Sequence, residues 1–346
     1  MNDGLTAAAA GFLLTGVTLI LLARLAPRLG LVDRPDGRRK LHEEPVPTVG
    51  GPAIFLALVA TAALGGWEGD VAAFLATGGC LVAVGALDDR FHLPVGTRAA
   101  VEFATATWMV FGAGVYVSDL GSLVGFAPIA LPIWLAYPFT LVAVFGILNA
   151  INMIDGLDGL AGSVVLAALL VLLALADHPP SLTLLGPALA GALAAFLTAN
   201  LRLVSALPRV FLGDGGSKLL GFALVWWLIA ATQDPAHRTP LLAPATTLYL
   251  VGLPLMDMVA VTLRRLRKGV SPFAPERTHL HHVLLRAGFA PRVVLAAIVA
   301  ASAALNALGV ALAAAGAPEA VQFALFLGLF AGYCRCVPRL LRLRRH

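Results

Sequence analysis

The sequence predicts an all-α, polytopic membrane protein, and three observations support that fold class. Hydrophobic residues make up 59% of the 346 residues and charged residues only 12%, whereas about 25% of the residues of soluble domains are charged. Runs of about 20 apolar residues, enough to cross about 30 Å of hydrocarbon, recur along the whole chain. Lys and Arg gather on alternate connections between these runs. This composition excludes a soluble globular domain and an intrinsically disordered chain.

Eleven apolar runs are the candidate membrane spans. They cover residues 5–24, 48–66, 70–87, 97–115, 131–150, 159–176, 181–200, 216–232, 240–262, 292–314 and 317–336. The first run follows Asp3 rather than a basic segment, so we expect a retained span and not a cleaved signal peptide. The longest polar stretches, 25–47 and 263–291, are too short to form a soluble core. We therefore expect a single transmembrane domain over residues 1–346.

The distribution of basic residues predicts the orientation of the chain. If the N-terminus lies outside and the spans alternate, all but one of the 24 Lys and Arg side chains fall on the inner side, and only Arg238 falls outside. Basic loops mark the cytoplasmic side of a membrane protein. We therefore expect a periplasmic N-terminus and a cytoplasmic C-terminus. The net charge of +5 arises from these loops and does not indicate a nucleic acid partner.

Acidic side chains on the inner side gather in three short motifs at the ends of spans. These motifs are G-A-L-D-D-R at 85–90, N-A-I-N-M-I-D-G-L-D-G-L at 149–160 and F-L-G-D-G-G-S-K at 211–218. Carboxylates that converge on one membrane face need a cation to be stable together. Oxygen ligands favour Mg²⁺, which usually takes one or two carboxylates and leaves room for substrate phosphates. The active face would be formed by the loops 25–47, 88–96, 150–158, 201–215 and 263–291.

Each motif also has a structural interpretation. The paired acids of the first motif could be solvated at a helix end and offset by Arg90. The polar residues from Asn149 to Asp158 recur every three residues, and helix capping would explain one of them but not readily four. On a continuous helix these side chains would turn away from one another. We therefore expect Gly156 and Gly159 to permit a break that curls the motif around one site.

The third motif and the last long loop carry further candidates. Backbone N–H groups at the start of the span from residue 216, with Lys218 in its first turn, suit a phosphate, although an ordinary Gly-rich turn is the alternative. The loop 263–291 carries histidines but no nearby Cys, so polar contacts to phosphate or sugar are favoured over zinc. Its Arg277 could clamp a phosphate oxygen. Two acids within spans, Asp257 and Glu102, have either a functional or a structural role.

Together these motifs resemble the polyprenyl-phosphate N-acetylhexosamine-1-phosphate transferases. The matching segments are R-R-K-L-H-E-E-P-V-P-T-V-G-G (38–51), L-D-D-R (87–90), N-A-I-N-M-I-D-G-L-D-G-L (149–160), F-L-G-D-G-G-S (211–217) and R-T-H-L-H-H (277–282). They occur in the order of the family and cover nearly the whole chain. In the last segment Leu280 interrupts the histidines and Arg277 precedes them. That pattern resembles the bacterial branch that uses UDP-GlcNAc more than the branch that uses UDP-MurNAc-pentapeptide.

The resemblance implies roles for particular residues. The catalytic residues would be Asp88, Asp89 and Asp155, with Asp88 the usual candidate base. The ligands of Mg²⁺, for which Mn²⁺ could substitute, would be Asp214 and Asn152. The nucleotide would be bound by Asp158, Phe211 and Asn149. The phosphates and the sugar would be bound by Arg277, His279, His281, His282 and Lys218. Less settled roles fall to Lys40, His42 and Asp257.

The resemblance also implies a reaction and its setting. GlcNAc-1-phosphate would pass from UDP-GlcNAc to undecaprenyl phosphate, with release of UMP, at the bacterial inner membrane. This would be the first membrane step in making O-antigen or a related cell-envelope polysaccharide. Membrane lipids are further partners, and a homodimer is left open. A lipid phosphate has a second pKa of about 6, so a strong general base is not obviously required, and Asp88 could serve as base, nucleophile or positioning residue.

Two alternatives remain. The first is the same chemistry with another UDP-N-acetylhexosamine or with UDP-MurNAc-pentapeptide. The second is a transporter of a nucleotide sugar or of a lipid-linked sugar. Transporters bind their substrates near the middle of the membrane, whereas the polar motifs of this chain crowd one face. The transferase is therefore favoured.

Overall fold

The computed structural model describes residues 2–35, 44–67, 69–174, 179–233, 241–271 and 278–340, and it is mostly helical. The helices are α1 (Asn2–Leu29), α2 (Gly50–Gly65), α3 (Val71–Phe91), α4 (Val95–Ala113), α5 (Ile133–Ile154), α6 (Leu160–Leu173), α7 (Pro180–Asn200), α8 (Gly213–Gln233), α9 (Pro244–Leu250), α10 (Gly252–Arg267), α11 (Leu280–Arg286), α12 (Pro291–Ala314) and α13 (Glu319–Leu340). A short antiparallel ribbon pairs β1 (Val32–Asp33) with β2 (Val46–Pro47). The predicted all-α class is confirmed.

Every predicted span coincides with helix in the described part of the chain. Among the described residues, seven helices are long and apolar enough to cross a membrane, or eight if the bent pair α9 and α10 is one span. Two further apolar helices, α2 and α6, have 16 and 14 residues. The chain is therefore an integral membrane protein with several spans, while the number eleven and the orientation stay predictions.

The run 240–262 is not the continuous span that the sequence predicted. It is divided into α9 and α10, which are bent by 80° at Val251. Pro254 has no N–H group to donate to the carbonyl of Leu250, so it disfavours a continuous helix. In the first turn of α10, by contrast, a residue has no helical carbonyl to donate to, so the missing N–H group of proline breaks no hydrogen bond there. The break therefore follows from a proline that apolar composition alone does not reveal.

The long helix α8 occupies the centre of the bundle. It packs against α2, α3, α5 and α6, and nearly all of its side chains are buried. Phe74 of α3 stacks on Trp227 with ring centroids 5.1 Å apart and meets Trp226 edge-on at 5.6 Å. Such aromatic contacts add about 0.5–1.5 kcal/mol each beyond the area that they bury. The core thus holds fixed the helix whose first turn carries Asp214.

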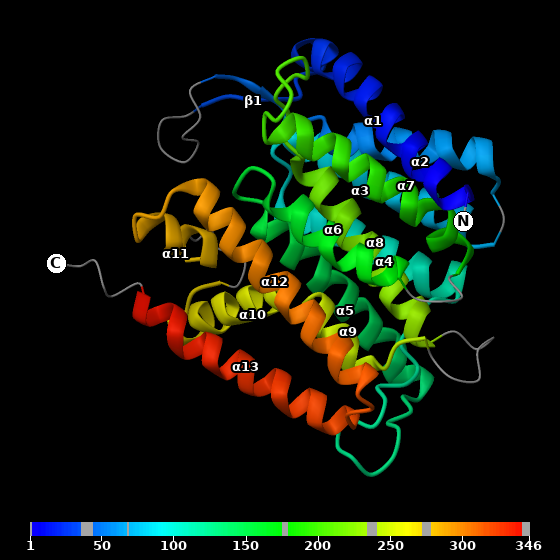
Figure 1. Cartoon of the computed structure of the whole chain (residues 1–346), viewed down its shortest axis with the longest axis vertical. Helices are drawn as coiled ribbons and strands as arrows, with labels where there is room; N and C mark the ends of the chain where they lie inside the picture. The colour runs from blue at the N-terminus through cyan, green and yellow to red at the C-terminus, as the bar shows by residue number, and fades with distance from the viewer. Residues whose placement is uncertain are drawn as a thin grey trace.

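The ends of the bundle differ in character (Figure 1). The ribbon β1–β2, the short helix α11 and the carboxyl end of α13 lie at one end, while the N-terminus of α1 lies at the opposite end. The described parts of the stretches 25–47 and 263–291, both predicted to be cytoplasmic, therefore contribute to the same end of the molecule. The arrangement agrees with an even number of crossings between them.

Helices α3 and α8 approach each other through glycine at the start of α8. A Cβ atom on Gly85 would lie 2.1 Å from the backbone nitrogen of Gly215, closer than any side chain permits. The glycines of the G-D-G-G-S motif therefore allow close packing of helices, in addition to any role in a turn. This approach brings Asp214 beside the acids at the end of α3.

Gly85→Ala is expected to destabilise the protein by about 1–3 kcal/mol, the usual cost of overpacking a filled interior. The added methyl group would push α8 away from α3. Thermal unfolding of the detergent-solubilised protein measures the loss. Gly16→Ala in α1 is the matched control, because a Cβ atom there meets nothing within 4 Å. Equal melting temperatures for Gly85→Ala and Gly16→Ala would show that the approach is less tight than described.

Candidate active site

Three helix ends bring the predicted acids together. Asp88 and Asp89 lie in the last turn of α3, Asp155 follows the end of α5, and Asp214 lies in the first turn of α8. The backbone N–H group of Asp214 donates to the Asp89 carboxylate, 3.2 Å from Oδ2. Gly213 adopts a left-handed conformation with φ of 75° at this point. The first and third sequence motifs are therefore in direct contact.

The second motif joins this cluster through Asn152. Its amide Nδ2 lies 3.0 Å from Oδ1 of Asp214 and 2.9 Å from the hydroxyl of Ser217. The chain then breaks after Ile154, as the sequence predicted, and Gly159 with φ of 77° starts α6. Asn152 and Asp214, the two predicted metal ligands, are thus neighbours from two different helices.

Arg98 is a member of the cluster that sequence reasoning missed. Its Nη1 lies 2.7 Å from Oδ2 of Asp88 and 3.7 Å from Oδ2 of Asp214. The other oxygen of Asp88 accepts the backbone N–H of Leu93 at 2.7 Å. Both oxygens of this buried carboxylate are therefore engaged. A sequence signal exists, since Arg98 lies in the first turn of the span after L-D-D-R, but a single basic residue there equally marks the cytoplasmic side.

The donor set fits a magnesium ion bound jointly with substrate. Among the described residues, no three His, Cys, Asp or Glu side chains are grouped so that they alone could hold a metal. Mg²⁺ does not need such a cage, because it usually combines one or two carboxylates with water and phosphate oxygens. Burial, and then the charges of Asp214 and Asp158, raise the pKa of the Asp155 carboxyl to about 8. This cluster of acids is therefore short of positive charge.

A second group of residues lies on the loops that flank this cluster. Asp158 forms an ion pair with Arg209 at 2.7 Å, and the Arg209 guanidinium lies 5.1 Å from the centre of the Phe211 ring. Asn200 is buried between the loops, where it accepts the N–H of Gly159 at 2.5 Å and donates to a backbone carbonyl at 2.8 Å. Asp158 and Phe211, both predicted to bind the nucleotide, are thus adjacent. Arg209 and Asn200 were not predicted as site residues.

The histidine motif is held by Asp257. Its Oδ2 lies 2.8 Å from Nδ1 of His279, and its Oδ1 accepts the hydroxyl of Tyr333 at 2.7 Å and the N–H of Leu280 at 3.0 Å. Asp257 thus fixes the ring of His279 and the start of α11. Tyr333, far along the chain on α13, is another partner that sequence reasoning missed.

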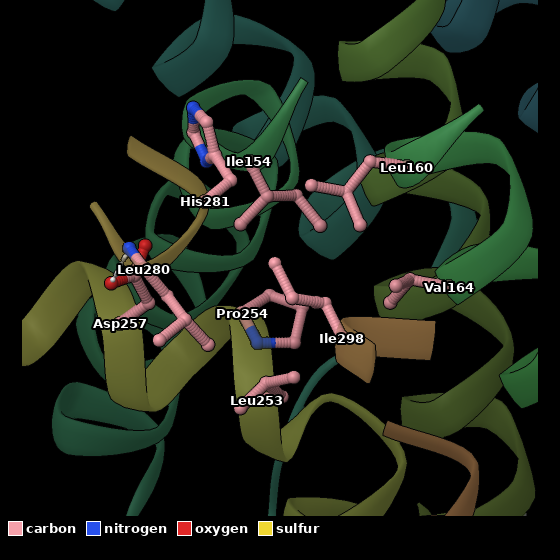
Figure 2. A pocket seen from close by; sticks show the side chains of 9 residues that line it. All are labelled: Ile154, Leu160, Val164, Leu253, Pro254, Asp257, Leu280, His281 and Ile298. Carbon is pink, nitrogen blue, oxygen red and sulfur yellow. Dashed lines mark hydrogen bonds between the residues drawn. The ribbon is translucent and has the colours of Figure 1, made fainter. Parts of the chain in front are cut away.

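His281 faces the break between α5 and α6. A Cβ atom on Gly156 would lie 2.3 Å from its Nε2, so the histidine motif packs directly on the second acidic motif. Figure 2 shows His281 beside Ile154 on the wall of a small cavity, with Asp257 next to Leu280 on another wall. Burial, and then the neighbouring His282 and His279, lower the pKa of His281 to about 3. The imidazole of His281 is therefore neutral at pH 7.

The structure differs from the sequence prediction at Lys218 and Asn149. Lys218 is 5% exposed and Glu102 is 2% exposed, and the Lys218 ammonium forms an ion pair with Glu102. Asn149 donates to the other oxygen of Glu102 at 2.7 Å. A buried ammonium must be paired, and this one is turned toward α4 rather than toward the acids. The structure therefore directs both side chains at Glu102, and this arrangement does not support the predicted phosphate contact of Lys218 or nucleotide contact of Asn149.

The start of α8 also differs from the predicted phosphate-binding site. The N–H group of Asp214 is directed at the Asp89 carboxylate, and Gly215 is packed against α3. The N–H group of Asp214 is therefore occupied by protein. The remaining site predictions, Lys40, His42 and Arg277, lie outside the described residues.

Comparison with known proteins gives concordant matches. A sequence model of glycosyl transferase family 4 matches residues 71–232. Proteins named undecaprenyl-phosphate alpha-N-acetylglucosaminyl 1-phosphate transferase from Escherichia coli strain K12 and from Yersinia pestis are each 38% identical over 96% of this chain and 91% of their own length. The protein of that name from Pasteurella multocida is 33% identical over 96% of this chain and 93% of its own.

Proposed function

Because this chain belongs to glycosyl transferase family 4, we propose that it transfers GlcNAc-1-phosphate from UDP-GlcNAc to undecaprenyl phosphate. An oxygen of the lipid phosphate would attack the β-phosphorus of UDP-GlcNAc. The bond from that phosphorus to the bridging oxygen would break, and UMP would leave. The observation that carries the proposal is the meeting of acids from three helix ends beside Asp158 and Phe211, in a chain that matches transferases along nearly its whole length.

Asp214 and Asn152 would hold Mg²⁺. The ion would neutralise the charge of the diphosphate, which an anionic acceptor must approach. Rotation of the Asn152 amide would present its oxygen instead of the nitrogen that now faces Asp214. Asp89 fixes the first turn of α8 by accepting the N–H of Asp214. The geometry thus supports one carboxylate and one amide as ligands, with substrate phosphates completing the set.

Asp88 would position groups rather than act as a base. Its two oxygens are occupied by Arg98 and by the N–H of Leu93. The lipid phosphate is already largely deprotonated at neutral pH, because its second pKa is about 6. Arg98, held by Asp88 and near Asp214, is placed to attract the acceptor phosphate. Catalysis of this transfer depends mainly on neutralising the charge of the phosphates and aligning them, as in other phosphoryl transfers.

The nucleotide and the sugar would occupy the flanking loops. Phe211 offers a ring on which uracil can stack, and Asp158 offers a carboxylate to the edge of the base. The neutral His281 and the oriented His279 would donate hydrogen bonds to the phosphosugar. These side chains come from the loops at one end of the bundle, as binding of a soluble nucleotide at a membrane surface requires.

The site would face the cytoplasm of a bacterium at its inner membrane. The support is the charge distribution, in which nearly every Lys and Arg belongs to the side that carries the acidic motifs. Eleven crossings would place the N-terminus outside and the C-terminus inside, with the bent pair α9 and α10 counted as one crossing. UDP-GlcNAc is a cytosolic compound and the acceptor is a lipid, so both reach a site at the inner interface.

Arg209→Gln is expected to raise the KM for UDP-GlcNAc by about tenfold, with a smaller change in kcat. The ion pair with Asp158 and the contact with the Phe211 ring would be lost, and charged hydrogen bonds contribute about 1.5–3 kcal/mol. Steady-state kinetics measure both constants. Arg202→Gln, on the same loop region, is the control. An unchanged KM in Arg209→Gln would remove Arg209 from the nucleotide site.

The test of the proposed function is reconstitution with defined substrates. The purified protein, undecaprenyl phosphate and Mg²⁺ are mixed with UDP-GlcNAc, UDP-GalNAc or UDP-MurNAc-pentapeptide, and UMP and the lipid product are measured. We expect UMP and lipid-linked GlcNAc in equal amounts with UDP-GlcNAc, and loss of both with a chelator. Passage of UDP-GlcNAc into sealed vesicles without UMP release would indicate a transporter and contradict the proposal.

A further inference from the structure

Two layers of polar side chains cross the same three helices. The first layer contains Arg98 of α4, Asp214 of α8 and Asn152 of α5, with Asp214 3.0 Å from Asn152 and 3.7 Å from Arg98. The second layer contains Glu102, Lys218 and Asn149. Each member of the second layer lies one helical turn from its counterpart in the first, at i+4 on α4 and α8 and at i−3 on α5. Because α5 runs against α4 and α8, all three steps lead away from the acids, by about 4.5–6 Å.

In the second layer Glu102 and Lys218 are buried and Asn149 is half-buried. Glu102 is its centre, since one carboxylate oxygen is paired with Lys218 and the other accepts Asn149 at 2.7 Å. Asn149 also donates to the carbonyl of Phe145 at 2.8 Å. A small cavity between α3 and α4 is lined by Arg98, Glu102 and Lys218, so the two layers adjoin the same space. The second layer thus links the three helices that carry the first.

A buried ion pair is seldom a source of stability. The cost of desolvating both charges usually offsets their attraction, and an apolar pair of similar size often serves stability equally well or better. An ion pair that is also hydrogen-bonded to a third helix does supply a fixed relative rotation and height of the helices that carry it. In this protein those helices carry the residues proposed to hold Mg²⁺ and the acceptor phosphate.

We propose that Glu102, with Lys218 and Asn149, is a positioning layer that holds α4, α5 and α8 in register so that Arg98, Asp214 and Asn152 converge on the metal and the phosphates. The inference rests on the proposed function. None of the three residues touches substrate in this account, and each acts through the residue one turn above it. A loosened layer would separate Asn152 from Asp214 and weaken Mg²⁺ binding before it unfolds the protein.

The test replaces the layer by residues of similar size. Glu102→Leu/Lys218→Met removes both charges, and Glu102→Lys/Lys218→Glu reverses the pair. Thr105→Val is the matched control, since the hydroxyl of this buried residue of α4 donates to the carbonyl of Glu102 in its own helix. Three quantities are measured for each protein: the melting temperature, its rise with added Mg²⁺, and the kinetics of transfer from UDP-GlcNAc.

We expect Glu102→Leu/Lys218→Met to melt at or above the wild-type temperature. Its half-saturating Mg²⁺ concentration should rise by about tenfold, both in the melting assay and in turnover. An effect of this size is typical of residues that influence a binding site without contacting the ligand. The reversed pair should recover most of this loss, and Thr105→Val should show none. The single variant Lys218→Met leaves a buried carboxylate unpaired and should instead lose stability.

Several results would overturn the inference. One is a stable Glu102→Leu/Lys218→Met protein with wild-type Mg²⁺ dependence and turnover. Another is a loss of turnover that parallels the loss of melting temperature in every variant, including Thr105→Val. The inference is also overturned if the melting temperature of the wild-type protein does not rise with added Mg²⁺. If the wild type responds to Mg²⁺ but releases no UMP from UDP-GlcNAc, the proposed function fails, while the melting comparison still decides the inference.

Discussion

Asp214→Asn is expected to reduce the rate of GlcNAc-1-phosphate transfer by about 10³-fold or more, with the protein still folded. A bound metal stabilises developing charge by several kcal/mol, and about 1.4 kcal/mol corresponds to a tenfold change in rate. The amide keeps the shape of the side chain and can still accept from Asn152. The defect should therefore appear in kcat, and the melting temperature without Mg²⁺ should be almost unchanged.

The control for Asp214→Asn is the same change at Asp119. Asp119 lies in the loop between α4 and α5, at the opposite end of these helices, where it accepts the N–H of Gly121 at 2.6 Å. Asp119→Asn keeps an acceptor oxygen and should leave turnover unchanged. UMP release is measured for both variants after purification. Near-wild-type turnover in folded Asp214→Asn would remove Asp214 from the metal site.

Asp88→Asn is expected to lower turnover by about 10²-fold, the upper range for residues that orient a site, and by the same factor at every pH between about 6 and about 9. The substitution weakens the ion pair with Arg98, so the Arg98 guanidinium is no longer held in position for the acceptor phosphate. A base could be replaced in part by hydroxide at high pH, whereas a positioning residue could not. The ratio of wild-type to variant rate is followed across the pH range.

Arg98→Met supplies the matching test for the Asp88 prediction. If Asp88 acts through Arg98, the effects of the two substitutions should not add, and the double variant should resemble the worse of the single ones. Recovery of Asp88→Asn at high pH, or full additivity with Arg98→Met, would contradict a positioning role and favour a base.

The fold was predictable as far as local signals determine it. The apolar runs give the helices, and Gly156 and Gly159 give the break after α5. The bend at Val251 was not predicted, because the run that contains Pro254 is apolar enough overall to suggest one span, and apolar composition reports the surrounding solvent rather than the path of the helix axis. Helix packing was also hidden, since the approach of Gly85 to Gly215 joins residues far apart in the sequence.

The candidate site was predictable where one motif carries several polar residues. Asp88, Asp89, Asn152, Asp155 and Asp214 meet as the motifs suggested, whereas Arg98 and Arg209 were counted only as orientation markers. A single cation in a loop has no local signal that separates these roles. Lys218 was not predicted to form an ion pair, for a related reason. Its position in the first turn of a helix suggested a phosphate ligand, but its partner Glu102 lies on a different helix, and pairing across helices cannot be read from spacing.

The central claim is that this chain transfers a phosphosugar, with the metal held by Asp214. The most direct measurement uses UDP-GlcNAc radiolabelled in its β-phosphate, together with undecaprenyl phosphate, Mg²⁺ and the purified protein. We expect the label to move into the lipid, the released nucleotide to be unlabelled UMP, and Asp214→Asn or a chelator to stop both. Label retained in a soluble nucleotide, or transfer that proceeds equally well in Asp214→Asn, would contradict it.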